Sequence, residues 1–305
     1  MGVLNCVFAM DMKGGDVIMI QALRVLRAAG VLDDVSVTVV LTGDEELSGN
    51  PKHLRSKELV DAGQWADYAI GFEDGDGNPQ TAVIARRGSS GWVLRTSGTR
   101  AHSSQVFQSE YGDGAIYEAA RILESFRSEL ASMESLTFNP GLILGGTEVD
   151  YDKSANRGTA FGKDNVISGT VTVTGDLRAS SPQQWEEATR RMRDIVARHL
   201  PMTGATIEFD RGYPPMAPAE GNYALLAMFS KVSEDLGFGE VRAVNPRNAG
   251  AADISFVAGE VEMAMDGVGL MGSGGHTLDE VADLSSMGPQ TKRVAVLLYR
   301  LSQIE

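Results

Sequence analysis

The sequence predicts an α/β domain into which a second domain is inserted. In the first ninety residues, apolar segments of strand character alternate with helical segments, which indicates a parallel sheet covered by helices. From about residue 85 the order changes to β-α-β-β-α-β, the order of a ferredoxin-like unit. After residue 215 the α/β alternation resumes. We therefore expect residues 1–85 and 206–305 to form one domain and residues 86–205 to form the insertion.

The elements of the first part follow from hydrophobic periodicity and β-branched content. The segment 35–41 gives the strongest strand signal, because five of its seven residues are β-branched. We expect it to form a buried strand that ends at Gly43. The expected strands are residues 4–9, 35–41 and 68–72, and the expected helices are residues 15–29 and 51–62.

Two amphipathic helices and four strands are expected in the inserted region. The second helix is marked at its start by Ser181, which can cap it, and by Pro182, which fits the first helical position. The expected strands are residues 91–97, 136–144, 170–177 and 206–210, and the expected helices are residues 114–131 and 182–199. In the final part we expect helices at residues 222–236, 252–257 and 288–304 and strands at residues 241–244 and 262–266.

The composition excludes several classes of protein. A net charge of −14 would repel a nucleic-acid backbone, and no apolar stretch is long enough to span a membrane. The single cysteine, Cys6, excludes an intrachain disulfide and a cysteine-rich zinc site, so that any metal must be held by His, Asp and Glu. No signal sequence precedes the domain, which favours the cytoplasm by default and leaves a periplasmic or secreted location open if an N-terminal segment is missing.

Acidic side chains follow three successive predicted strands. Asp11 comes after the first strand, Glu45 and Glu46 come after the second, Glu73 comes after the third, and His276 lies in a glycine-rich loop after the last strand. Each of them alone would be an ordinary polar loop residue. Together they indicate a site, because ligands bind beyond the carboxyl ends of strands in open α/β sheets. Adjacent carboxylates also repel one another unless cations or protons compensate them, so the sequence predicts a divalent-metal site at this edge.

Four motifs resemble those of the co-catalytic zinc exopeptidases, the family of carboxypeptidase G, aminoacylase, acetylornithine deacetylase and succinyl-diaminopimelate desuccinylase. They are Asp-Met-Lys-Gly-Gly at residues 11–15, Asp-Glu-Glu at 44–46, Arg-Ala-His-Ser-Ser at 100–104 and Gly-His-Thr at 275–277. Residues 87–92 and 162–167 are most similar to the glutamate-carboxypeptidase-like branch. The resemblance implies a zinc-exopeptidase-type mixed sheet with helices on both faces, and an inserted ferredoxin-like domain that forms a homodimer.

The resemblance also implies a site for two Zn²⁺ ions, for which Co or Mn can substitute. Asp11 would bridge the ions, Glu46 would be a terminal ligand, and Glu73 and His276 would complete the positions that this chain supplies. Two such ions share a water and lower its pKa, so that it ionises to a bridging hydroxide. Glu45 would be the general base that takes its proton. The implied activity is metallopeptidase-type hydrolysis of amide or peptide bonds.

Four further residues are assigned by the same resemblance. His102 would reach across the dimer interface into the partner's active site and stabilise the oxyanion. Asn165, Arg178 and the glycine-rich turn at Gly250 match positions that hold a substrate carboxylate, for which arginine is well suited. Taken without the family, His102 is a surface histidine and Arg178 a strand-end ion pair. The expected enzyme is a carboxypeptidase that releases a C-terminal amino acid such as glutamate from a small peptide, and the alternative is an N-acyl amino-acid deacylase.

Two departures from the family pattern bear on activity. The family carries a His-x-Asp motif before the bridging aspartate, whereas no histidine stands among the ten residues before Asp11. We therefore expect that the first part of the α/β domain is lacking and that one zinc site is impaired. The rival hypothesis is a truncated, non-catalytic remnant that still dimerises. Tyr213 stands where several relatives carry an arginine, which weakens the expected preference for a substrate with a second carboxylate.

Overall fold

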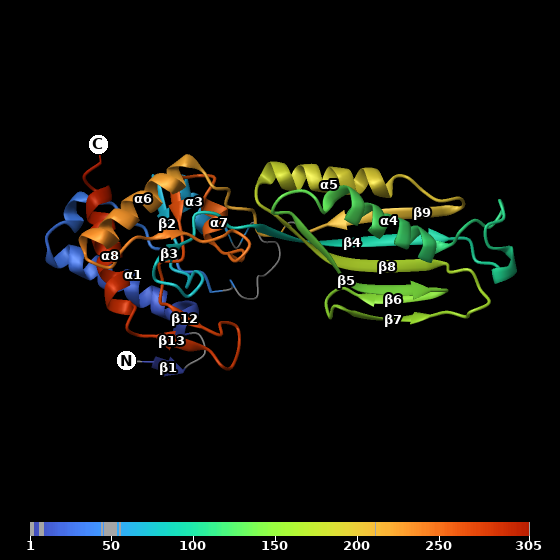
Figure 1. Cartoon of the computed structure of the whole chain (residues 1–305), viewed down its shortest axis with the longest axis horizontal. Coiled ribbons are helices and arrows are strands. Elements are labelled where there is room, and N and C mark those ends of the chain that lie inside the picture. The colour runs from blue at the N-terminus through green and yellow to red at the C-terminus, as the bar shows by residue number, and fades with distance from the viewer. Residues whose placement is uncertain are drawn as a thin grey trace. The chain divides into compact units, whose positions relative to one another are not determined.

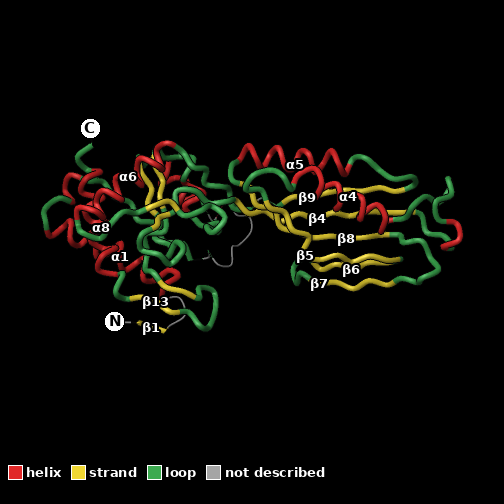
Figure 2. Tube along the Cα trace, in the orientation of Figure 1, coloured by secondary structure: helices red, strands yellow, loops and turns green. Residues whose placement is uncertain are grey.

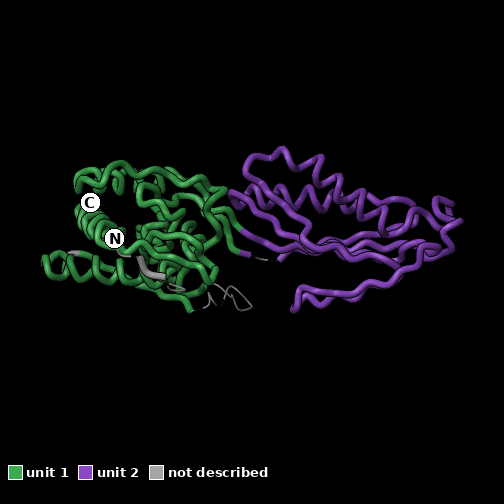
Figure 3. The backbone as a smooth tube through the Cα atoms, turned by 60° about the horizontal axis from the view of Figure 1, so that its bottom comes forward, with its two compact units in different colours: residues 1–88, 213–305 green, residues 89–212 purple. Residues whose placement is uncertain are grey.

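The computed structural model describes residues 3–5, 9–43, 45, 54, 56–210 and 212–304 of the chain (Figure 1). The chain divides into two compact units, which Figure 3 colours separately. Unit 1 comprises Met1–Gly88 and Tyr213–Glu305, and unit 2 comprises Ser89–Gly212. Unit 2 is thus one continuous segment inserted between the two parts of unit 1. In the described part of the chain, no helix combines the length and the apolar character needed to cross a bilayer.

Unit 2 is built on a four-stranded sheet in the order β5-β8-β4-β9. Along the chain its main elements are β4 (Gly88–Gly98), α4 (Ala115–Leu130), β5 (Thr137–Gly146), β8 (Thr170–Ala179), α5 (Pro182–Val196) and β9 (Thr203–Phe209). β4 pairs antiparallel with β9, and β5 pairs antiparallel with β8. The succession β-α-β-β-α-β and the strand order confirm the ferredoxin-like unit that the sequence predicts.

The two helices of unit 2 lie on the same face of its sheet, as Figure 2 shows. Their apolar sides share one core with the sheet, in which Phe126 of α4 meets Trp92 of β4 edge to face, with ring centroids 6.1 Å apart. α5 begins as predicted, because the Ser181 side chain accepts a hydrogen bond from the Gln184 N–H and Pro182 occupies the first turn. This cap and the buried apolar side therefore fix the start and the orientation of α5.

A hairpin that the sequence analysis did not predict follows β5. It is formed by β6 (Glu148–Asp152) and β7 (Arg157–Phe161), which pair antiparallel. All the residues of β7 are exposed. A strand with no buried side carries no alternation of apolar and polar residues, which explains why its sequence gave no strand signal.

The described strands of unit 1 are short and fall into three small sheets. Two pairs are parallel: β2 (Tyr68–Ile70) with β11 (Met263–Met265), and β3 (Thr81–Ala82) with β10 (Arg242–Ala243). The third sheet is antiparallel and joins β1 (Val3–Asn5), β13 (Val281–Asp283) and β12 (Gly272–Ser273). The strands of unit 1 are therefore mixed in direction, rather than purely parallel as the alternation of strands and helices alone predicts.

Helices surround these strands and enclose the core of unit 1. They are α1 (Gly15–Ala28), α3 (Lys57–Gly63), α6 (Glu220–Asp235), α7 (Ile254–Val257) and α8 (Met287–Leu301), with short helical turns at Ala9–Gly14 and Leu32–Asp34. Ile18 of α1, Phe229 of α6 and Leu297 of α8 are completely buried in the same core. The core thus joins the part of unit 1 that precedes unit 2 to the part that follows it.

The segment 35–41 does not form a strand, and the prediction of a buried strand there was wrong. Its residues have no regular secondary structure, and Val37, Val39 and Leu41 expose 42%, 43% and 62% of their surface. A β-branched run favours extended backbone, but a strand also requires a paired neighbour and a packed face. The described residues supply neither of these for this segment. Of the predicted helix 51–62, the structure describes α3 from Lys57 onward, and residues 51–53 lie outside the described residues.

Candidate active site

Asp11 and His276, which are far apart in the sequence, lie side by side in unit 1. Asp11 belongs to the helical turn Ala9–Gly14 that leads into α1, and His276 lies in the loop between β12 and β13. The Nε2 atom of His276 is 3.4 Å from Oδ2 of Asp11. The turn is anchored by the N–H of Met10, which donates a 2.8 Å hydrogen bond to the buried carboxylate of Glu280. This contact brings together two of the predicted metal ligands.

Glu73 joins this pair from the loop after β2. Burial raises the pKa of Glu73 to about 10, and the nearby Asp266 and Asp11 carboxylates and a hydrogen bond with Asp11 act in the same direction. Burial and the Asp11 carboxylate likewise raise the pKa of Asp74 to about 6. Several acidic groups thus share one partly buried place in unit 1. Carboxyl groups so close together either hold protons or are compensated by cations.

A buried ion pair supports the cluster, and sequence reasoning missed it. The carboxylate of Asp266, at the end of β11, is 3.0 Å from Nη2 of Arg86 and accepts a 3.0 Å hydrogen bond from its Nε. The same carboxylate accepts hydrogen bonds from the N–H groups of Glu73 and Gly267. Arg86 in turn donates to the carbonyl of Gly250 at 2.8 Å. One signal was present, because Asp266 is the last residue of the predicted strand 262–266 and so repeats the pattern of carboxylates at strand ends.

Glu45 is described, whereas Glu46 lies outside the described residues. The carbonyl of Glu45 accepts a 3.2 Å hydrogen bond from the Tyr213 hydroxyl, and the Tyr213 ring packs against Phe256 with centroids 5.0 Å apart. Nearby in sequence, the Thr42 hydroxyl donates to the Asp253 carboxylate. The chain that carries Glu45 is therefore tied to the second part of unit 1. Tyr213, the residue that replaces the expected arginine, provides one of these ties.

The donor atoms of Asp11, Glu73 and His276 suit a divalent metal. Two carboxylates and an imidazole are ligand types that Zn²⁺ takes, and a cation would offset the mutual repulsion of the carboxylates. Among the described residues, however, no three His, Cys, Asp or Glu side chains are already arranged as a metal-binding group. We conclude that three of the four predicted ligands share one region with suitable donors, and that their present spacing is not that of a complete coordination shell.

The predicted residues of unit 2 occupy two places within it. His102 and Asn165 are neighbours, because His102 forms a β-bridge with Val166 and the N–H of Ser103 donates to the Asn165 carbonyl at 2.9 Å. Arg178 lies in β8 and forms a 2.9 Å ion pair with Asp176, and both side chains are partly exposed. The interpretation of Arg178 as a strand-end ion pair thus has a direct structural basis.

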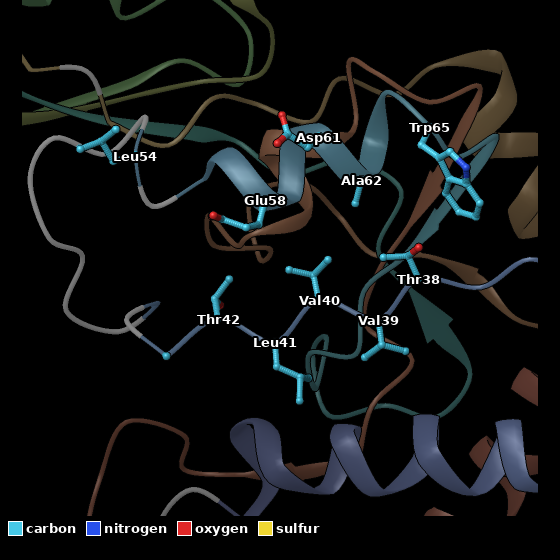
Figure 4. A pocket seen from close by; sticks show the side chains of 11 residues that line it. Thr38, Val39, Val40, Leu41, Thr42, Leu54, Glu58, Asp61, Ala62 and Trp65 are labelled. Carbon is cyan, nitrogen blue, oxygen red and sulfur yellow. The ribbon is translucent and has the colours of Figure 1, made fainter.

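A separate pocket lies beside the extended segment that was predicted to be a strand (Figure 4). Its volume is about 810 Å³. Its lining comprises residues 38–43, Leu54, Glu58, Asp61, Ala62 and Trp65. Neither Asp11 nor Glu73 nor His276 lines it. The pocket is therefore distinct from the carboxylate–imidazole cluster.

The mixed α/β unit 1, with its carboxylate–imidazole cluster, and the inserted ferredoxin-like unit together define a zinc-exopeptidase-type fold. The chain belongs to the Peptidase family M20/M25/M40, because the sequence model of this family matches residues 5–300.

Curated relatives are similar over much of the chain. Carboxypeptidase G2 of Pseudomonas sp. is 22% identical over 298 residues, which are 95% of this chain and 65% of that protein. A succinyl-diaminopimelate desuccinylase of Methylococcus capsulatus is 28% identical over 194 residues, which are 63% of this chain and 48% of that protein. The chain thus spans about two thirds of the first relative's length and about half of the second's.

Solved structures share the fold at low sequence identity. An aminopeptidase PepT from Bacillus cereus superposes with a TM-score of 0.71 at 18% identity, over 95% of this chain and 71% of that one. A tripeptidase from Staphylococcus aureus superposes with a TM-score of 0.65 at 19% identity, over 96% of this chain and 71% of that one. At such identities the likeness establishes the fold alone.

Proposed function

We propose that the protein is a metal-dependent hydrolase of amide or peptide bonds. The observation that carries this proposal is the convergence of Asp11, Glu73 and His276 in unit 1 of a chain of this peptidase family. These three ionisable side chains come from separate segments of unit 1, and Asp11 contacts both of the others. A partly buried cluster of ionisable groups, in which the pKa of Glu73 is raised, is typical of functional sites.

Asp11, Glu73, His276 and Glu46 are the residues that would hold metal. The family carries two Zn²⁺ ions per chain, and one of the two sites would be impaired here. Two divalent ions would polarise the scissile carbonyl and make a water acidic at neutral pH. The proposal rests on the donor chemistry of the three described side chains, with Glu46 assigned through the resemblance of residues 44–46 to the family.

The remaining steps are assigned to side chains of the protein. Glu45 would take a proton from the attacking water and deliver it to the leaving amine, a role typically worth about 10²–10⁴-fold in rate. His102 of a partner subunit would donate a hydrogen bond to the developing oxyanion, a contribution that is typically about 10²–10³-fold. By the resemblance to the family, Asn165, Arg178 and the backbone at Gly250 are each assigned to binding the substrate carboxylate. Hydrogen bonds to the carboxylate would hold the end of the substrate that lies next to the amide bond to be cleaved.

The proposed substrate is a small peptide or N-acyl amino acid with a free carboxylate, from which a C-terminal residue such as glutamate is released. Similarity to a carboxypeptidase supports this choice, and similarity to a desuccinylase supports N-acyl amino-acid deacylation as the second candidate. Both reactions break an amide bond next to a carboxylate. They differ in the acyl group, which the assay below varies.

A homodimer through unit 2 is part of the proposal, and apolar side chains at the start of α4 support it. Phe107, Ile116 and Tyr117 expose more than half of their surface, as does Ile143 of β5. The Phe107 and Tyr117 rings are 5.5 Å apart, and Ile116 lies beside Gly145 of β5. Exposed apolar side chains grouped in this way are typical of protein interfaces.

The test is turnover of a panel of dipeptides and N-acyl-glutamates by the metal-stripped protein with Zn²⁺, Co²⁺ or Mn²⁺ restored. We expect metal-dependent release of the C-terminal residue and up to two Zn²⁺ per chain, with the impaired site only partly filled. Glu45→Gln should lower kcat by about 10²–10⁴-fold, whereas Glu234→Gln, an exposed change on α6, should not. Absence of both turnover and stoichiometric metal would reject the proposal in favour of the non-catalytic, dimerising alternative.

A further inference from the structure

The imidazole of His102 is held by the residue two positions after it. His102 is the cap of the short helical turn Ser103–Gln105, and its side chain accepts a hydrogen bond from the backbone N–H of Ser104. The distance from that nitrogen to Nδ1 is 3.3 Å. The Ser104 hydroxyl oxygen lies 2.9 Å from the same ring nitrogen. Ser104 therefore contacts Nδ1 through both its backbone and its side chain.

The turn that makes these contacts is fixed to the neighbouring chain segment. The Ile167 N–H donates to the Ala101 carbonyl at 2.9 Å, and the Ser103 N–H donates to the Asn165 carbonyl at the same distance. The Gln105 N–H closes the turn on the His102 carbonyl. Because the backbone is held on both sides of His102, the Ser104 N–H points to Nδ1 as a fixed donor.

These contacts determine which ring nitrogen carries the proton. A backbone N–H can only donate a hydrogen bond, so the ring nitrogen that faces it must present a lone pair. The serine hydroxyl can rotate to donate to the same nitrogen. In the neutral ring the proton then resides on Nε2, at the other edge of the imidazole. Within the described part of the chain no side chain or backbone group occupies Nε2, and the residue is exposed.

We propose that Ser104 is a positioning residue for His102. Ser104 keeps the neutral imidazole of His102 in the Nε2–H form, so that the exposed edge of the ring is a hydrogen-bond donor. The inference rests on the proposed function only for its catalytic consequence, namely that His102 donates to an oxyanion. A donor of defined orientation suits such a role, because preorganised donors stabilise developing negative charge without reorganising. The tautomer itself can be measured without any substrate.

The first test is nuclear magnetic resonance of the full-length chain with ¹⁵N-labelled histidine, at about pH 9, where imidazoles are neutral. The chain has four histidines, and His102→Ala identifies the signals of His102 by their loss. We expect a protonated Nε2 and an unprotonated Nδ1 in the wild type. Ser104→Ala should shift the tautomer ratio toward Nδ1–H by roughly two- to tenfold, the contribution of one neutral hydrogen bond. Ser104→Thr, which keeps the hydroxyl, should restore the wild-type ratio.

The second test asks whether Ser104 acts through His102. In the metal-loaded enzyme, Ser104→Ala should lower kcat by roughly two- to tenfold with little change in KM. Ser103→Ala, which removes the adjacent hydroxyl and keeps the backbone contact with Asn165, is the matched control and should leave kcat unchanged. In a His102→Ala background, Ser104→Ala should have no further effect, because residues that act as one unit are not additive.

The outcomes separate this inference from the proposed function. A wild-type Nδ1–H signal, or a tautomer ratio that Ser104→Ala leaves unchanged, would overturn the inference whatever the activity. A tautomer that shifts in Ser104→Ala with unaltered turnover would support the assignment of Ser104 and reject the oxyanion role of His102. A loss of kcat in Ser104→Ala that persists in full without His102 would also overturn it.

Discussion

At the scale of single residues, Arg86 is a buried cation close to the acidic cluster of unit 1. Burial and neighbouring carboxylates raise the pKa of Glu73 and of Asp74, and the charge of Arg86 opposes that rise in both cases. Arg86 is almost completely buried, and so is its partner Asp266. A buried charge that has lost its partner lowers the free energy of unfolding far more than an exposed charge does. This ion pair therefore connects the stability of unit 1 to the place where metal is proposed to bind.

Arg86→Ala should lower the free energy of unfolding of the protein by about 3–5 kcal/mol, because it leaves the Asp266 carboxylate buried without its cation. Urea denaturation followed by circular dichroism measures the change. The matched control is Arg95→Ala, which breaks an exposed ion pair with Glu208 at 3.2 Å and should cost no more than about 1 kcal/mol. Equal losses in the two variants would contradict the structural role given to Arg86.

The individual site residues differ in how far the sequence could reveal them. Asp11, Glu73 and His276 each follow a predicted strand, and the structure brings all three together. The ion pair of Arg86 with Asp266 joins two segments that are 180 residues apart in the sequence, so local sequence could at most single out the strand-end position of Asp266. Glu46 lies outside the described residues, and its role stays a prediction.

At the scale of elements, Glu118 connects the two helices of unit 2. Its carboxylate is fully buried on α4 and accepts hydrogen bonds from the Arg121 guanidinium at 2.7 and 3.1 Å. It also accepts one from the Leu200 N–H, just beyond α5, at 3.0 Å, and its Oε1 is 3.4 Å from Nδ1 of His199. Burial acts to raise the pKa of Glu118, but the hydrogen bonds from Arg121, Leu200 and His199 outweigh it and hold the pKa below its usual value.

Glu118→Gln should therefore destabilise unit 2 by about 1.5–3 kcal/mol at pH 7, the range for hydrogen bonds to a charged group. Because the pKa of Glu118 is lower in the folded state than in the unfolded chain, its ionised form stabilises the fold above about pH 4.5, and that contribution is lost as the pH falls through the folded-state value. Urea unfolding at several pH values should show the wild type and the variant converging in acid. Glu124→Gln, at an exposed pair with Arg127 on the same helix, is the control and should leave the stability of unit 2 nearly unchanged, because solvent screens an exposed pair. A difference that grows in acid would contradict this account.

The elements also show where sequence patterns are sufficient. α4, α5, α6 and α8 have buried apolar sides that recur with helical period, and each lies within a few residues of its prediction. The prediction of a strand at residues 35–41 failed because β-branched content describes a local preference, whereas strand formation depends on a neighbouring strand elsewhere in the chain. The hairpin of β6 and β7 was missed for a different reason. All of β7 is exposed, and the apolar side of β6 consists of only two half-buried residues, Val149 and Tyr151.

At the scale of the whole molecule, the proposed assembly is a homodimer. The exposed residues Ile116 and Ile143 of unit 2 are the natural place to test it. Light scattering coupled to size exclusion should give twice the 32.6 kDa mass of the chain. The double variant Ile116→Glu/Ile143→Glu should shift the population to monomer, because buried unpaired charges disfavour an interface. Tyr223→Glu, at an exposed aromatic residue of unit 1, should leave the mass unchanged. A wild-type protein that is monomeric at micromolar concentration would contradict the proposed dimer.

The central claim is that Asp11, Glu73 and His276 together hold a metal ion. The most direct measurement is an anomalous difference map at the zinc edge, from crystals of the full chain grown with Zn²⁺. The account predicts strong anomalous density at bound zinc, about 2.0–2.2 Å from carboxylate oxygens of Asp11 and of Glu73 and from the His276 imidazole. Zinc-saturated crystals in which these three side chains contact no metal would contradict it.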